Sequence, residues 1–291
     1  MSVDVLQEKI RKMKNPIVVD FSVLPEHIPP HIRHEGAPED AYARFCLELM
    51  EGLKDTVPGV RFSFGQLALM GERGLPVLSR LLTAAREMGY YVLLDSSEIL
   101  TPWGADRAAE GFFSPDSRFG CDGLILSPYI GTDAIKPFLP YCREGKKDAY
   151  FAVRTPNKSA SDLQDLLTGA RHVYTAAADL LARFGETMVG RSGYSNICAL
   201  VSAGSATSLT ELRAKYKRMF LLVDGYDYPS GNAKNCSLAF DRLGHGAAVC
   251  AGPAITAAWY EAESNGADFV DQAVRAAERV RKNIVRYVTI V

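Results

Sequence analysis

Charged side chains stand at or near the ends of short apolar runs in this chain, where strands would deliver them to one site. Asp20 lies in PIVVDF, Arg61 in GVRFSF, and Asp95 ends YYVLLD. Carboxylates gathered in this way can hold Mg²⁺ and its water, or can pair with an arginine that would be costly to bury alone. The run ends together hold five acids and two arginines: Asp20, Asp95, Glu98, Asp224, Asp227, Arg61 and Arg154.

Eight such apolar runs alternate with amphipathic segments along the whole chain. They are nearly continuous and rich in Val, Ile, Leu and aromatic residues, which is typical of parallel strands buried on both faces. This alternation predicts an α/β fold, a (β/α)₈ TIM barrel in which residues 1–291 form a single domain. A doubly wound open sheet is the alternative, although no GxGxxG follows the first run. The predicted strands are 16–21, 59–64, 90–95, 122–127, 149–155, 197–203, 219–225 and 247–252.

Helical patterns fill the segments between and around these runs. A short amphipathic helix is expected over 3–14, and a long C-terminal helical segment over 254–287 with a break near Gly266. Gly89 follows AAREM at the place where a helix would stop. Ser208 and Glu211 fit a capping box, in which Ser208 caps a helix and Glu211 reaches back to it.

The barrel prediction brings three of the charged residues together. The active site of such a barrel lies at the carboxyl ends of its strands. Because the first three strands are neighbours, we expect Asp20, Arg61 and Asp95 to form one ion-pair cluster at that end. The cluster can be interpreted as a salt bridge that only closes the barrel or as an altered binding site.

The overall composition excludes several classes of protein. The chain has 291 residues, of which 47% are hydrophobic and 23% charged, and its net charge is −1. No strong positive field is available for nucleic acid. No run approaches about 18 apolar residues, so no membrane span is expected. The charged N-terminal segment has no apolar signal core, and we therefore expect a cytoplasmic protein.

The cysteines and histidines show no spacing that is typical of a metal site. No CxxC pair occurs, and His27, His31 and His34 share one predicted loop rather than a rigid support. We therefore expect no metal and interpret the cysteines as buried free thiols in a reducing compartment. The cysteines are Cys46, Cys121, Cys142, Cys198, Cys236 and Cys250.

Several segments resemble, in order, the bacterial type 2 orotidine 5′-monophosphate decarboxylase family. DGLILSPYIGTDAIKPFL is similar to the family's DAxTVNPYLGxDSLEPFL, and AVRTPNKSASDLQDL to VRTSNPGAxDLQxL. VRFSFGQLALMGERGLPVL resembles FKPQxAFFExxGxxGLxxL, and YVLLDSSEI resembles VILDAKRGDI. VDFSVLPEHIP, FLLVDGYDYPSGN and AAVCAGPAI resemble the family's opening, its GYGAQGG segment and its final strand. The matches run from about residue 16 to residue 255 and cover most of the chain.

The resemblance implies decarboxylation of orotidine 5′-monophosphate to UMP, in pyrimidine biosynthesis, by a charge network that needs no cofactor. The family's first Lys corresponds to Arg61 and its first Asp to Asp95. The proton-donating Lys corresponds to Ser97, whose hydroxyl cannot supply an ammonium charge. The second Asp, contributed across the family's dimer interface, corresponds to Leu100. We therefore expect an impaired enzyme in which Arg61, Asp95 and Ser97 stand at the catalytic positions.

The resemblance also assigns the ligand-binding positions. Asp20 corresponds to the ribose-binding acid, and Thr155 and Asn157 could hydrogen-bond a planar heterocycle. Gly225 and Tyr226 lie in the loop that resembles GYGAQGG. The phosphate-binding Gln and Arg of the family correspond to Pro229 and Pro253, which lack the required donors. Asp224 and Asp227 replace the family's Pro and Gly and are expected to repel a phosphate.

Three functions remain open from the sequence. The first is a catalytically impaired member of the decarboxylase family with a small-molecule ligand, a nucleotide or another heterocycle. The second is a barrel enzyme with a different, metal-assisted reaction at its acidic mouth. The third is a non-catalytic partner of an active paralogue. The family analogy implies a homodimer, and the third function implies a heterodimer with that paralogue.

Overall fold

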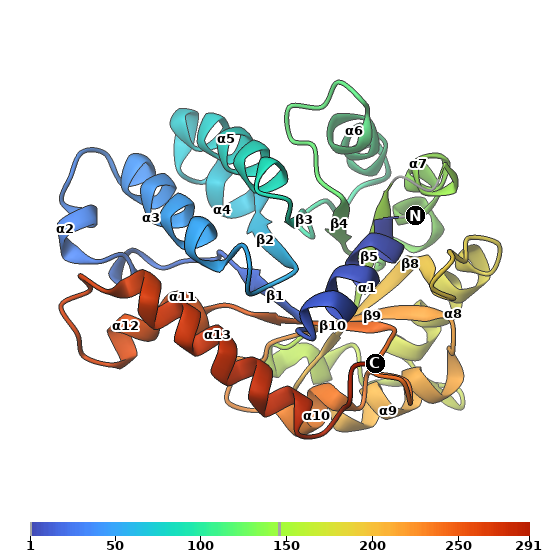
Figure 1. The fold of residues 1–291 in the computed structure, drawn as a ribbon. Coiled ribbons are helices and arrows are strands. Elements are labelled where there is room, and N and C mark those ends of the chain that lie inside the picture. The colour runs from blue at the N-terminus through green and yellow to red at the C-terminus, as the bar shows by residue number, and fades with distance from the viewer. Residues whose placement is uncertain (1, 145–146) are drawn as a thin grey trace.

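Eight parallel strands close into a barrel, and helices surround it (Figure 1). The computed structural model describes residues 2–144 and 147–291. All eight predicted strands are confirmed, and the open-sheet alternative is wrong because β1 pairs with both β2 and β10. The barrel strands are β1 (Ile17–Asp20), β2 (Gly59–Ser63), β3 (Tyr91–Asp95), β4 (Gly123–Leu126), β5 (Asp148–Arg154), β8 (Ser195–Ser202), β9 (Met219–Asp224) and β10 (Ala247–Ala251).

The helices between the strands turn one apolar face toward the barrel. In α3 (Pro38–Leu53), for example, Phe45, Leu49 and Leu53 recur at four-residue spacing and are fully buried, as expected for an amphipathic helix. The other helices are α1 (Ser2–Met13), α2 (Pro30–Arg33), α4 (Phe64–Ala68), α5 (Gly74–Glu87), α6 (Pro102–Phe113), α7 (Leu139–Arg143), α8 (Val173–Gly185), α9 (Ala206–Lys215), α10 (Ala233–Ser237), α11 (Pro253–Thr256), α12 (Ala258–Glu261) and α13 (Phe269–Val285).

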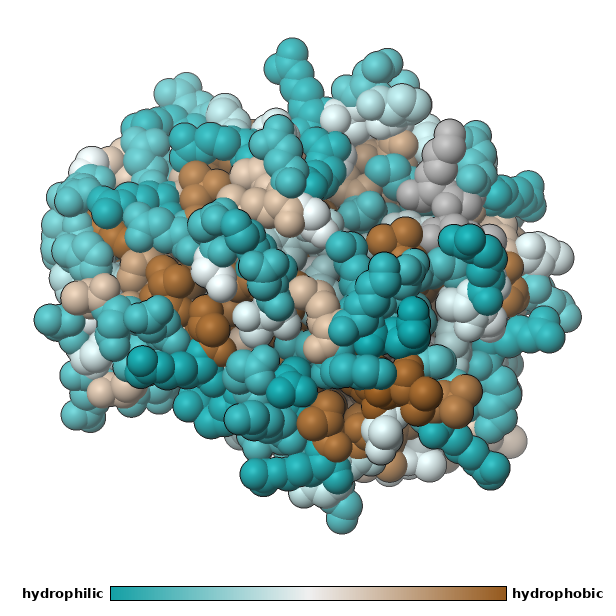
Figure 2. Space-filling model, in the orientation of Figure 1, coloured by the Kyte–Doolittle hydropathy of each residue, from teal (hydrophilic) through white to brown (hydrophobic). Residues whose placement is uncertain are grey.

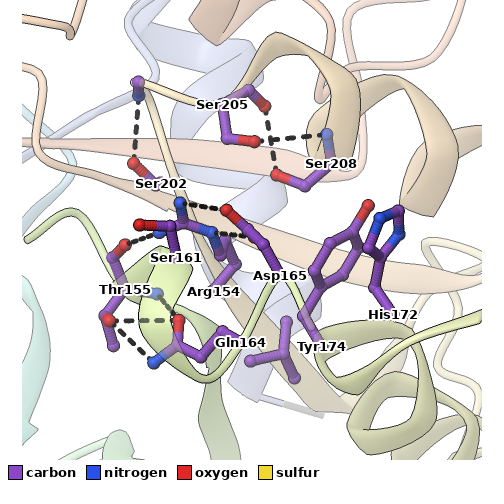
Figure 3. A network of polar contacts seen from close by, with 12 residues as sticks. Arg154, Thr155, Ser161, Gln164, Asp165, His172, Tyr174, Ser202, Ser205 and Ser208 are labelled. Atoms are coloured by element: carbon purple, nitrogen blue, oxygen red, sulfur yellow. Dashed lines mark hydrogen bonds and ion pairs between the residues drawn. The ribbon is translucent and has the colours of Figure 1, made fainter. Parts of the chain in front are cut away.

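Two local features differ from the sequence prediction. Ser208 does not cap a helix: α9 begins earlier, and its cap is Ser205, whose hydroxyl accepts a hydrogen bond from the Ser208 amide (Figure 3). Glu211 does not reach back either, because its carboxylate accepts hydrogen bonds from the hydroxyls of Tyr174 and Thr175. The structure also contains a short antiparallel hairpin that the sequence analysis missed, β6 (Leu167–Thr168) with β7 (Arg171–His172).

Alternate residues of each strand face the barrel interior or the surrounding helices. In β2, Val60 and Phe62 belong to the cluster between strands and helices, whereas Arg61 reaches carboxylates at the carboxyl end of the barrel. A second apolar cluster fills the interior, and Leu6 and Ile10 of α1 belong to it. The helix α1 therefore covers the amino-terminal end of the barrel and leaves the opposite end for ligands.

A buried polar group lies at that covered end, among apolar neighbours. The Tyr91 hydroxyl donates a hydrogen bond to Asp148 Oδ2 and lies 2.9 Å from the Tyr150 hydroxyl. Gly123 makes room for both rings, because a Cβ there would lie 2.7 Å from Tyr150 Cε2 and 2.9 Å from the Tyr91 hydroxyl. Burial raises the pKa of Asp148 to about 7, and the hydrogen bond from Tyr91 only partly opposes that shift.

The cysteines are free and buried, as the sequence predicted. Burial raises the pKa of each thiol, to about 12 for Cys121 and Cys236 and further for the others. Thiolate formation is therefore suppressed at all six positions in the folded protein.

The outer surface is mostly polar on the face seen in Figure 2, where hydrophobic atoms gather only in separate patches. Within residues 2–144 and 147–291, no helix has the length and apolar character needed to cross a bilayer.

Candidate functional site

Arg61 is the centre of an ion-pair cluster at the carboxyl end of the barrel. Its guanidinium contacts Asp95 Oδ2 through Nη2, Asp224 Oδ1 at 2.9 Å through Nη1, and Asp20 Oδ2 at 3.4 Å through Nη1. The expected cluster of Asp20, Arg61 and Asp95 therefore forms, and Asp224 joins it from β9. All four side chains are at most 16% exposed, so these contacts are shielded from solvent screening.

The electrostatics of the cluster follow from three carboxylates that share one cation. Burial alone would lower the pKa of Arg61, but Asp20, Asp224 and Asp95 outweigh burial and hold it well above its ordinary value. Burial raises the pKa of Asp224, and Arg61 opposes that rise. Arg61 is thus a permanent cation, and the cluster carries excess negative charge when all three acids are ionised.

Asp95 and Ser97 lie side by side after β3. The Ser97 amide donates to Asp95 Oδ1 at 3.0 Å, while Asp95 Oδ2 pairs with Arg61. Both carboxylate oxygens of Asp95 are therefore occupied by groups of this chain. Leu100, a few residues further along, is 55% exposed and does not line the cavity beside the cluster.

A cavity of about 370 Å³ opens beside this cluster, within the size range of small-molecule sites. Of the catalytic and ligand-binding residues assigned by the resemblance, Arg61, Asp95, Ser97, Thr155 and Asn157 line it. Asp20 touches the cluster through Arg61 but does not line the cavity. The remaining lining residues are Ile125, Ser127, Tyr129, Ala152, Pro156, Gln164, Leu200, Asp224 and Tyr228.

Gln164 orders the polar wall of the cavity, and the sequence analysis missed it. The Thr155 amide donates to Gln164 Oε1 at 2.8 Å, and Gln164 Nε2 donates to the Thr155 hydroxyl at 2.9 Å (Figure 3). The Thr155 hydroxyl lies 2.6 Å from Asn157 Oδ1. The sequence signal for Gln164 was its place in the segment SDLQDL, which resembles the family's DLQxL. These neutral donors and acceptors suit the edge of a heterocycle.

Arg154 and Glu98 do not take the places of the missing family lysine and aspartate. Arg154 makes a two-pronged ion pair with Asp165, with Nε–Oδ1 at 2.7 Å and Nη2–Oδ2 at 2.9 Å (Figure 3). Glu98 lies against Gly65 and does not line the cavity, and burial raises the pKa of its carboxyl. Arg154 therefore adds no second cation to the Arg61 cluster, and Glu98 adds no further carboxylate to the cavity wall.

The loop after β9 contributes differently from the sequence prediction. Gly225 has φ +81°, a conformation that favours glycine, and its amide donates to Asp224 Oδ1 at 2.9 Å. Tyr226 packs against the apolar cluster outside the barrel and does not line the cavity. The tyrosine that lines the cavity is Tyr228, two residues later, which is 49% exposed. The loop position was identifiable from sequence, but the choice of aromatic residue was not.

Asp227 binds the backbone at the start of α11. Its Oδ2 accepts from the Gly252 amide at 2.6 Å and its Oδ1 from the Ala254 amide at 2.7 Å. Burial raises the pKa of Asp227, and the two amides oppose that rise. The residue between them, Pro253, has no amide hydrogen to offer.

The described residues contain no group of three or more His, Cys, Asp or Glu side chains arranged to hold a metal ion. At the acidic mouth, the Arg61 guanidinium occupies the point on which Asp20, Asp95 and Asp224 converge. A divalent cation bound by these three acids would have to displace that guanidinium.

A closed (β/α)₈ barrel with a polar cavity at the carboxyl ends of its strands is the architecture of barrel proteins that act on small molecules. The chain is 31% identical over 252 residues to an orotidine 5′-phosphate decarboxylase of Clostridium acetobutylicum, with 84% of this chain and 87% of the relative aligned. It is 25% identical to the enzyme of that name from Clostridium novyi, with 98% of each chain aligned. The chain belongs to the orotidine 5′-phosphate decarboxylase family.

Solved structures agree on the fold. The Leishmania donovani OMP decarboxylase superposes with a TM-score of 0.76 at 20% identity, over 98% of each chain. The Leishmania donovani UMP synthase superposes with a TM-score of 0.78 at 21% identity, but this chain spans only 56% of its length. No protein-family model matches the chain.

Proposed function

We propose that this chain is a member of the orotidine 5′-phosphate decarboxylase family whose decarboxylation of orotidine 5′-monophosphate to UMP is impaired. The observation that carries the proposal is the arrangement around Asp95, which holds Arg61 on one oxygen and the Ser97 amide on the other. The family's catalytic ammonium has no counterpart there, because Ser97 offers only a hydroxyl. A hydroxyl is a poor acid at neutral pH.

A direct turnover assay tests the proposal. We expect the purified protein to convert orotidine 5′-monophosphate at least about 10⁴-fold more slowly than the Clostridium acetobutylicum relative, because a positioned general acid alone contributes about 10²–10⁴-fold and lost charged contacts to phosphate add to that deficit. Loss of the substrate's ultraviolet absorbance and chromatographic detection of UMP provide the measurement.

An Asp95→Asn variant, purified in the same way, is the matched control. Equally slow loss of ultraviolet absorbance with both proteins supports the proposal. Any activity that persists unchanged in Asp95→Asn is then attributed to a contaminating host enzyme. Activity near that of the relative which disappears in Asp95→Asn would contradict it, and would mean that Arg61 and Asp95 have been rebuilt into a working site.

The assembly we propose is a homodimer that uses the surface after β2 and β3. Three apolar side chains are exposed there: Leu69 at 90%, Leu100 at 55% and Trp103 at 74%. Exposed apolar side chains of this size favour association when they cluster. We expect Trp103→Glu to shift the protein toward monomer in analytical ultracentrifugation, with Tyr287→Glu on an exposed site after α13 as the control.

Sedimentation as a monomer at all concentrations would contradict the homodimer. If the same surface instead binds only a co-expressed, active paralogue, the chain is the non-catalytic partner considered above. We also propose a cytoplasmic location, because six buried free thiols suit a reducing compartment.

A further inference from the structure

The Asp227 carboxylate occupies the place where a barrel of this kind usually binds phosphate. Such a phosphate site is formed by the loops after the seventh and eighth barrel strands and by the N-terminus of a short extra helix. Here those strands are β9 and β10, and the short helix is α11. Asp227 follows β9, and its two oxygens accept the Gly252 and Ala254 amides. An anion of the chain itself is therefore bound there.

The remaining backbone groups of this turn are also used. The amides of Ile255 and Thr256 both donate to the Gly252 carbonyl oxygen at 2.8 Å. Pro253 has no amide hydrogen. Every amide from Gly252 to Thr256 is thus either absent or already bonded within the chain. A phosphate would find no backbone donor in this turn unless the Asp227 carboxylate moved away.

Charge excludes a phosphate as well. Asp227 lies near enough to Asp20 and Asp224 for these acids to influence its ionisation. The cation of that cluster, Arg61, is already shared by three carboxylates. A phosphate dianion would add charge of the same sign to this group, which opposes binding strongly in a partly desolvated site.

The cavity itself keeps groups that suit an uncharged ligand. Thr155, Asn157 and Gln164 offer neutral donors and acceptors, and Tyr129 and Tyr228 offer aromatic surface. Its volume of about 370 Å³ is large enough for a small heterocycle with a sugar. We propose that this cavity binds an unphosphorylated, uncharged nucleoside, with Asp227 as the internal anion that excludes a 5′-phosphate. The inference rests on the proposed function, since it names the ligand class of the same site.

Titration calorimetry with uridine and UMP as probes tests the inference. We expect wild-type protein to bind uridine at least about tenfold more tightly than UMP, since an unfavourable charge contact changes affinity by such a factor or more. In Asp227→Ala the order should reverse, because UMP gains the freed amides while uridine binding stays nearly unchanged. Asp227→Asn keeps the side-chain shape but removes the charge, and it is the second variant in case Asp227→Ala folds poorly. It should also reduce the preference of the protein for uridine over UMP.

Asp241→Ala is the matched control. Asp241 also accepts two backbone amides, from Leu243 at 2.8 Å and His245 at 2.9 Å, but it precedes β10 at the other end of the barrel. Its removal should leave the ratio of uridine to UMP affinity unchanged.

Three results would overturn the inference: wild-type protein that binds UMP as tightly as uridine, no uridine binding at millimolar concentration, or an unchanged preference in both Asp227 variants. These results are distinct from failure of the proposed function. An inactive protein that prefers UMP keeps the proposed function and loses this inference, whereas rapid turnover refutes the proposed impairment by itself.

Discussion

Replacing Arg61 with methionine should lower the free energy of unfolding at pH 7 by about 3–5 kcal/mol, the range for removing one partner of a buried ion pair. Arg61 is 8% exposed, and its loss leaves Asp20, Asp95 and Asp224 facing one another without a cation. Methionine preserves much of the side-chain volume, so the effect reports on charge rather than on a cavity. Chemical denaturation at constant ionic strength gives the measurement.

The pH dependence of the Arg61→Met effect distinguishes charge from packing. Without Arg61, the variant relieves repulsion by taking up protons, beginning with Asp224, whose pKa burial already raises. A carboxyl whose folded pKa is raised favours folding at low pH and loses that contribution as pH rises. The destabilisation should therefore be larger at pH 7 than at pH 5.

Arg213→Met is the matched control for this experiment. Arg213 is also 8% exposed, but its guanidinium donates to carbonyl oxygens, at 2.6 Å to Ala239 and 2.7 Å to Gly246. Its replacement should destabilise the protein by an amount that changes little between pH 5 and pH 7. An equal and pH-independent loss in both variants would show that Arg61 acts through packing alone.

Titration of Asp148 should lower the free energy of unfolding of the wild-type protein between about pH 4 and pH 7, and Asp148→Asn should remove that contribution. Burial raises the pKa of Asp148 from 3.8 to about 7. Its contribution to stability is therefore fully present below about pH 4 and is lost as pH rises through 7. At about 1.4 kcal/mol for each pKa unit, the upper bound on this loss is on the order of 4 kcal/mol.

Denaturation curves at pH 5, 6, 7 and 8 check this prediction as the difference between variant and wild type. Differences are needed because burial also raises the pKa of Asp122, Asp224 and Asp227. Asp148→Asn should gain stability relative to wild type with rising pH. Asp241→Asn is the control, because the pKa of Asp241 is lowered and its titration falls at acid pH. A difference for Asp148→Asn that stays constant from pH 5 to 8 would refute the prediction.

The barrel was predictable because its strands are buried on both faces. Their apolar, β-branched composition is nearly continuous, so each run is visible without knowledge of its partners. The hairpin of β6 and β7 was not predictable. Its four strand residues, which include Arg and His, are exposed or half-exposed and form no apolar run. Ser208 and Glu211 matched a capping motif by spacing. In the structure, however, Ser205 is the N-cap of α9, and the Glu211 carboxylate accepts a hydrogen bond from Tyr174 of α8.

The ion-pair cluster of the site was predictable in part, because its residues lie at the ends of strands that the sequence identifies. Asp20, Arg61 and Asp95 lie on neighbouring strands, so strand order alone brings them together. Asp224 reaches Arg61 from β9, two strands from β1 in the barrel order, and that contact depends on stagger and side-chain length. The position of Asp227 was harder still, because its partners are backbone amides, which carry no sequence signal.

The six buried thiols allow local unfolding of this chain to be measured without any added label site. They lie in α3, in the loop before β4, and in α7, β8, α10 and β10, so they sample several separate sectors of the barrel. Since each thiol is both hidden and protonated in the closed state, an alkylating reagent marks only molecules that have opened locally. Mass spectrometry of the marked peptides, taken at increasing times, would rank the sectors by how readily they open. A ligand that occupies the cavity should slow the marking of Cys250, whose strand adjoins the ion-pair cluster, more than that of Cys46 on the outer shell.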